Sequence, residues 1–289
     1  MVAYPGTPPA ELRGRVRQHL GYVMQLVDAR KNLADHRRLL VVGGWLSLLG
    51  ATVHIDLHQW PAAVARLRTA AEMARHAEHP ELAAWCLETQ AWRVLTDGDY
   101  PRAVALAQSA QRVAPRGSSA FIQATAQEGR GWARLGKRAE TYDALARVDQ
   151  LVAPIPVPDR PEHHYRYDPS KSQAYVVTTL SWLGDSAAEA YARQVLARLE
   201  STTDHGPTRP RRAASARLDL SLALLASDQT DEAGSVAMAA VTSGRLVPSN
   251  FWRAQEVVAA VERRGVQEAA ELRDAYETLC QPADPTTSG

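Results

Sequence analysis

A short turn followed by a stripe of small residues recurs along this chain at intervals of roughly 40 residues, and this repetition most constrains the fold. In the clearest copy Gly98 can adopt the positive φ that ends one helix, Asp99 can cap the next, and Pro101 is tolerated in a first turn. Small residues then follow at spacings of four and three, at Ala103, Ala107 and Ala110. Such spacings place them on one helical face, which lets a neighbouring helix pack closely. The pattern predicts two helices joined by a turn.

The same pattern occurs four more times, with turns at His58–Pro61, Leu135–Arg138, Leu183–Asp185 and Asp228–Glu232. Apolar periodicity also predicts a helix over Pro9–Asn32, before the first copy. We therefore expect an all-α fold, a solenoid of about five helix pairs with an N-terminal helix and a C-terminal capping helix pair.

The turn Gly98–Asp99–Tyr100 and the small residues after it resemble the tetratricopeptide repeat (TPR). The segments Leu82–Trp85 and Ala133–Gly136 are also similar to the TPR region of actinobacterial helix-turn-helix regulators of the XRE type. In that family a DNA-binding domain precedes the solenoid, which is the sensing or dimerising half. Only one helix is predicted before the first repeat here, so we expect no direct sequence-specific DNA binding by this chain.

The predicted organisation follows from the repeats and from proline content. A tail and helix over 1–37 precede TPR-like repeats one to three over 38–152. A proline-rich His/Tyr loop over 153–169 separates them from degenerate repeats four and five over 170–247. Capping helices over 248–280 and a disordered tail over 281–289 end the chain.

Composition narrows the possible partners. The 33 basic and 32 acidic side chains give a net charge of +1, without the basic excess typical of nucleic-acid-binding domains. Two cysteines favour a reducing compartment over a disulfide framework. We find no run of about 18 consecutive apolar residues and no secretory signal, so we expect a cytoplasmic protein without a membrane partner.

The candidate binding surface is a groove. In TPR solenoids the first helix of each pair lines the concave face, and the resemblance places one stripe of that face at Trp85, Glu88 and Trp92. Their offsets of three and seven independently put them on one side of a helix. The corresponding positions in the other repeats are Trp45, Leu48, Thr52, Gln123, Arg130 and Gln173. Aromatic rings with a few polar anchors are typical of sites for small ligands or peptides. The alternative is that the tryptophans pack between helices as core.

The loop carries a second group of candidates. Tyr165 and Tyr167 could fold over the groove, or the loop could be a surface spacer. His163, His164 and Asp168 are weak metal-ligand candidates because their spacing on a loop is irregular. We expect no catalytic residue and no cofactor.

Three functions remain open. The leading hypothesis is a regulatory module that senses a small molecule or binds a peptide or protein segment in the groove. The alternative is an enzyme or accessory protein that uses the groove and the His163–Asp168 loop for acid/base or metal chemistry. The third is a self-associating scaffold, with a homodimer as its simplest form.

Overall fold

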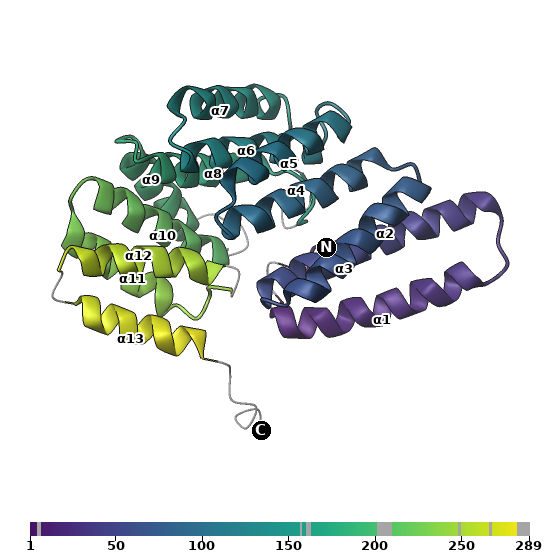
Figure 1. Ribbon diagram of the computed structural model, residues 1–289, viewed down its shortest axis with the longest axis horizontal. Coiled ribbons are helices and arrows are strands. Elements are labelled where there is room, and N and C mark those ends of the chain that lie inside the picture. Colours follow the sequence, from purple (N-terminus) through teal and green to yellow (C-terminus); the bar gives the residue numbers. More distant parts are fainter. Residues whose placement is uncertain are drawn as a thin grey trace. The chain divides into compact units, whose positions relative to one another are not determined.

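The computed structural model describes residues 1–4, 7–156, 158–159, 163–200, 210–247, 250–265 and 268–281, without the side chains of 170 and 171. These residues form thirteen α-helices and no strand (Figure 1), so the predicted all-α class is confirmed. The chain divides into two compact units, Met1–Thr179 and Leu180–Gly289. The tail predicted over 281–289 lies outside the described residues apart from Gln281, as do positions 157 and 160–162 of the loop.

Unit 1 contains seven complete helices within its described residues. They are α1 (Pro9–Asp28), α2 (Leu33–Asp56), α3 (Trp60–His76), α4 (Pro80–Thr96), α5 (Tyr100–Val113), α6 (Ser119–Arg134) and α7 (Arg138–Val152). Each packs on the next along the chain, and α4 also packs on both α2 and α6. The helices α2, α4 and α6 therefore form one row.

Helix α8 (Pro169–Leu183) begins in unit 1 and ends in unit 2. The remaining helices are α9 (Ala188–Glu200), α10 (Pro210–Ala226), α11 (Thr230–Val241), α12 (Phe251–Arg263) and α13 (Ala269–Cys280). Consecutive helices pack together here too, and α10 also packs on α12, as α11 does on α13. In each unit, therefore, consecutive helices pack together and some helices also pack on the next but one.

The five predicted turns share a left-handed backbone residue. Gly98 has a φ of 84°, and the equivalent positions are Gly136 (68°), Gly184 (67°), His58 (54°) and Asp228 (60°). Glycine adopts this conformation without a steric cost, whereas the other two residues do so against their preference. The Asp99 side chain accepts a hydrogen bond from Arg102 N at 3.2 Å, which caps α5 as the sequence predicts.

The small-residue stripes are buried between helices. Their members with no exposed surface are Ala63, Ala70, Ala103, Ala107, Ala110, Ala188, Ala192, Ala233, Ala237 and Ala240. The contact between α5 and α6 is close enough that a Cβ on Gly131 would lie 2.6 Å from Val104 Cγ2. Small side chains at these positions allow the helices to approach each other.

Helix α1 ends at Asp28, four residues earlier than the sequence pattern predicts. The reason is local, because the Asn32 side chain accepts a hydrogen bond from Asp35 N at 2.8 Å and caps α2 instead.

In the described part of the chain, α2 is long and apolar enough to cross a membrane by length and composition, with a mean hydropathy of 1.5 over 18 residues. In this structure 61% of that stretch is buried. Leu48, Val53 and Ile55 have no exposed surface, so the apolar character of α2 matches its packing against α1, α3 and α4.

Candidate functional site

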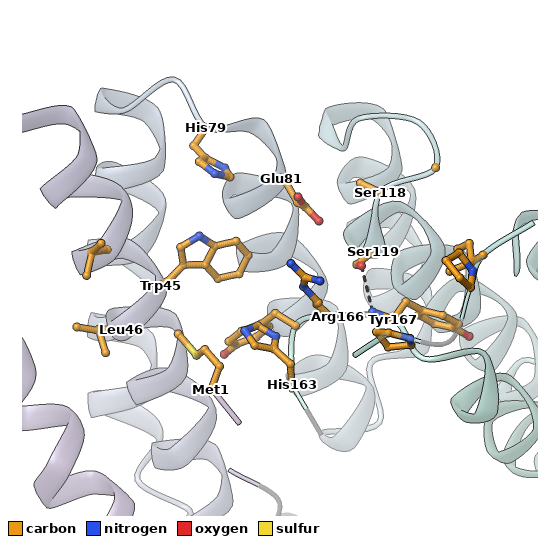
Figure 2. Close-up of a pocket in the computed structure, with 16 residues that line it drawn as sticks. Met1, Trp45, Leu46, His79, Glu81, Ser118, Ser119, His163, Arg166 and Tyr167 are labelled. Carbon is orange, nitrogen blue, oxygen red and sulfur yellow. Dashed lines mark hydrogen bonds between the residues drawn. The ribbon is translucent and has the colours of Figure 1, made fainter. Parts of the chain in front are cut away.

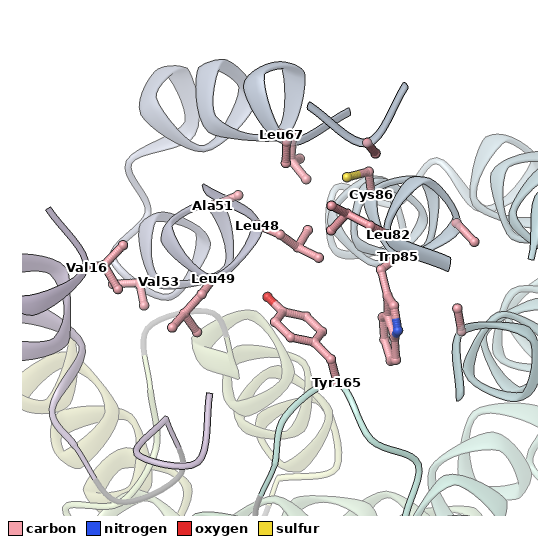
Figure 3. Packing of buried hydrophobic residues seen from close by; sticks show 14 of the residues in the cluster. Val16, Leu48, Leu49, Ala51, Val53, Leu67, Leu82, Trp85, Cys86 and Tyr165 are labelled. Atoms are coloured by element: carbon pink, nitrogen blue, oxygen red, sulfur yellow. The ribbon is translucent and has the colours of Figure 1, made fainter. Parts of the chain in front are cut away.

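Tyr165 reaches from the loop into the interior of unit 1. Its ring lies beside Leu48, Leu49 and Trp85 (Figure 3), and its side chain is only 3% exposed. The ring centroid lies 5.2 Å from that of Trp45 and 5.2 Å from that of Trp85. These are distances at which aromatic pairs attract each other.

The hydroxyl of Tyr165 forms a hydrogen bond at the buried end of its ring. Its hydroxyl lies 2.9 Å from Thr52 Oγ1. Because the Thr52 hydroxyl donates its one hydrogen to Leu48 O, Tyr165 is the donor in this pair. Burial raises the pKa of Tyr165 well above its usual value, so the phenol stays neutral and keeps its hydrogen.

Tyr167 is the second buried ring of the loop. A turn precedes it, in which Arg166 N donates to His163 O at 3.1 Å. Tyr167 N then donates to Ser119 Oγ at 3.0 Å (Figure 2). The ring packs in an apolar cluster with Ile122 and Val148, which belong to α6 and α7. The loop is therefore held to the helices by both side chains and main chain.

Polar residues from three helices meet beside these rings, and we refer to Glu88, Gln123, Arg130 and Tyr175 as the inner network. Gln123 Nε2 donates to Glu88 Oε1 at 3.1 Å and to the Tyr175 hydroxyl at 2.8 Å. The Arg130 guanidinium lies 5.4 Å from the Tyr175 ring centroid, within cation–π range. Glu88, Gln123 and Arg130 are at most 8% exposed. Helices α4 and α6 therefore carry buried polar side chains next to Tyr165 and Tyr167.

A cavity of about 800 Å³ adjoins Tyr165 and Tyr167. Figure 2 shows Trp45 on one side of it, Ser119 on the other, and Arg166 pointing toward Glu81. Its remaining lining includes Leu46, His79, Ser118 and His163. This volume falls in the range of small-molecule sites. The cavity offers an aromatic wall together with charged groups of both signs.

Some of the predicted groove residues line the cavity or lie beneath Tyr165, and others do not. Trp45 lines the cavity, while Trp85 lies beneath Tyr165 and is 4% exposed. Trp92 is half-buried on α4 and does not line the cavity. Gln173 is exposed, and Tyr175 joins the inner network instead. Two residues correspond to about 200° around a helix, so these two side chains point in opposite directions.

The weak metal candidate in the loop is not supported. Within the part of the chain that the structure describes, no three His, Cys, Asp or Glu side chains gather closely enough to hold a metal ion. The His164 ring packs on Tyr4, with centroids 4.2 Å apart, while His163 lines the cavity. Asp168 is 1% exposed. The two histidines of this group therefore contact different parts of unit 1.

Several residues of this region were not predicted. Tyr175 shares a helix face with Trp182, seven residues later, and this offset was an available signal. Tyr4 donates to Asp56 Oδ2 at 2.7 Å. It lies outside any helix, so periodicity could not have identified it.

Unit 2 has a different interior. Arg253 of α12 forms an ion pair with Asp219 of α10, and both side chains are buried. The Arg253 guanidinium also lies 5.6 Å from the Trp182 ring centroid. The Trp182 and Trp252 rings are 5.8 Å apart. The sequence analysis did not predict the ion pair of Arg253 with Asp219, whose members are 34 residues apart.

No protein-family model matches the chain, and no curated protein matches its sequence.

Proposed function

We propose that this chain is a TPR-like solenoid that serves as a cytoplasmic regulatory module and binds a ligand in the groove beside α2, α4 and α6. The ligand is a peptide, a protein segment or a small molecule. The observation that carries the proposal is the cavity of about 800 Å³ next to Trp45. Its size and aromatic wall suit a binding site.

Two features support the repeat part of the proposal. The five turns share a left-handed residue at equivalent positions. The second helix of each of four pairs buries small residues, as α5 does with Ala103, Ala107 and Ala110. Each pair then buries its apolar surface only against its neighbours, as repeat arrays do.

The chemistry of the buried groups favours binding over nucleophilic catalysis. Burial raises the pKa of Cys86 to about 12, so its thiol remains protonated near neutral pH. Burial likewise keeps Tyr165 neutral. The cavity itself presents Trp45 of α2 and Glu81 of α4, which suit a ligand with an apolar body and a polar or basic group.

The test is a thermal-shift screen of short peptides and common metabolites, followed by titration of each positive compound. A specific ligand should stabilise the wild-type protein by about 2.7 kcal/mol at 100 times its Kd. The Trp45→Ala variant should lose this stabilisation, because Trp45 lines the cavity. The Trp92→Ala variant is the matched control, since Trp92 lies on α4 outside the cavity lining, and it should retain the response. A screen in which no stabilisation depends on Trp45 would reject the proposal.

A further inference from the structure

We infer that the groove recognises a turn-forming peptide with two aromatic side chains at positions i and i+2, and that His163–Asp168 occupies this site as a tethered competitor. The inference rests on the proposed function, because it names the ligand chemistry and the regulation of the same groove.

The first anchor is Tyr165. It belongs to a loop between α7 and α8, yet its hydrogen-bond partner Thr52 lies 113 residues away on α2. Loop side chains usually lie at the surface, whereas this ring is enclosed by Trp45 and Trp85. An aromatic ring in a desolvated pocket with one polar contact is the usual form of an anchor residue in peptide recognition.

The second anchor is Tyr167, two residues later. Its main-chain N–H donates to Ser119 Oγ, and its ring packs against α6 and α7. Between the anchors, Arg166 is exposed and lines the cavity. Two buried rings, one main-chain hydrogen bond and an exposed residue between them describe a bound peptide, here supplied by the chain itself.

A buried donor that packs against the tethered segment is unused. Trp85 packs on Tyr165 and is 4% exposed, but its indole N–H has no hydrogen-bond partner among the described residues. A buried donor without an acceptor costs free energy. The packing of the tethered segment on Trp85 therefore leaves a polar group of the groove unsatisfied.

The tether sets the threshold for binding. A segment joined to the site by short connections acts at an effective concentration in the millimolar range. An external peptide therefore binds the intact chain with an apparent Kd equal to its intrinsic Kd divided by the fraction of molecules whose groove is open. The groove thus rejects weak aromatic peptides and responds only to strong or abundant ones.

The experiment uses the full chain and a synthetic peptide with the sequence of residues 163–168, acetylated and amidated at its ends. The Tyr165→Ala/Tyr167→Ala variant opens the groove. This variant should bind the peptide at least tenfold more tightly than the wild type and should regain thermal stability on binding. The matched control is Tyr142→Ala, which alters an exposed tyrosine of α7 and should behave as the wild type. A peptide with alanine in place of both tyrosines should not bind.

A second variant covers the case in which the alanine protein does not fold. Tyr165→Leu/Tyr167→Leu keeps apolar side chains at both anchors but cannot donate to Thr52. It should bind the wild-type peptide at least threefold more tightly than the unmodified chain. Equal affinities in the folded variant, or equal binding of the tyrosine and alanine peptides, would overturn the inference.

The outcomes separate the two proposals. If the screened compounds stabilise the chain through Trp45 but the peptide does not bind the opened groove, only the inference fails. If neither occurs, the proposed function fails as well.

Discussion

One buried polar contact in each unit illustrates a different kind of partner. In unit 1 the Thr52 hydroxyl is met by Tyr165, a neutral side chain that comes from a loop. In unit 2 the Asp219 carboxylate is met by Arg253, a charged side chain carried by a helix. Separation of a buried ion pair leaves a charge without compensation, whereas loss of a neutral hydrogen bond costs much less. In these two contacts the partner in unit 2 comes from helix α12, while the partner in unit 1 comes from the loop between α7 and α8.

Unit 1 also contains buried charged groups, among them Glu88 and Arg130 of the inner network and Glu128 between α5, α6 and α7. Glu128 accepts hydrogen bonds from Gln108 at 2.9 Å, Gln111 at 2.8 Å, Arg147 at 3.0 Å and Trp132 at 3.2 Å. The charged Glu128 therefore joins α5 and α7 to α6, whereas the contact between Tyr165 and Thr52 is neutral.

The largest expected effect is in unit 2. Asp219→Ala leaves the buried Arg253 without its partner and should lower the free energy of unfolding by about 3–5 kcal/mol. Urea denaturation with hydrogen exchange of α10 and α12 peptides measures the loss. Asp219→Leu combined with Arg253→Met should recover most of it. Glu232→Ala removes an exposed ion pair with Arg193 and should have no measurable effect. A loss for Asp219→Ala no larger than that of Glu232→Ala would contradict the role given to the pair.

Glu128→Gln should have the next largest effect, about 1.5–3 kcal/mol at neutral pH, because it removes a charged acceptor. Burial acts to raise the pKa of Glu128, but hydrogen bonds from Gln108, Gln111 and Arg147, with the charge of Arg147, outweigh it and lower the pKa. A lowered pKa stabilises the fold above the unfolded value, near pH 4.3, and this stabilisation disappears as the pH falls through the folded value.

The measurement for Glu128 is the melting temperature of both proteins between pH 7 and pH 3. The difference between wild type and variant should shrink below about pH 4.3. A difference that stays constant over this range would show that the charge of Glu128 does not stabilise unit 1.

Tyr165→Phe tests the neutral contact directly. It removes the hydrogen bond to Thr52 and should cost about 0.5–1.5 kcal/mol, well below the loss expected for Asp219→Ala. A double-mutant cycle with Thr52→Val isolates the pairwise contribution. Tyr22→Phe alters a tyrosine that is 61% exposed and serves as the control. A cost as large as that of Asp219→Ala would remove the contrast between the two interiors.

The smallest expected effect compares a turn in each unit. Asp228 has a φ of 60° in unit 2, where the equivalent residue of unit 1 is Gly98. Asp228→Gly should relieve backbone strain and stabilise the protein by about 0.5 kcal/mol, while Gly98→Ala should destabilise it by about 1 kcal/mol. Chemical denaturation resolves the opposite signs. The same sign for both changes would mean that the two turns are not equivalent.

Local physical chemistry determined much of this protein. The positive φ at Gly98, the cap at Asp99 and the shared face of Ala103, Ala107 and Ala110 depend on spacings of at most four residues, each about one helical turn. These features could be predicted because helical period and backbone sterics act over short stretches of chain. The offset of Trp85 and Glu88 predicted that both lie on one side of α4, and both are buried, but the offset did not determine whether that side faces a ligand or the core.

Only the tertiary structure decided what those faces contact. The insertion of Tyr165 beside Thr52 joins positions 113 residues apart, and the pairing of Arg253 with Asp219 joins positions 34 residues apart. The orientation of α8, which turns Gln173 to solvent, depends on packing against other helices in the same way. No local period encodes such contacts, because they depend on how whole helices and the loop pack. The sequence therefore determined the helices and turns, and the tertiary structure decided that the loop buries Tyr165 against α2 and α4.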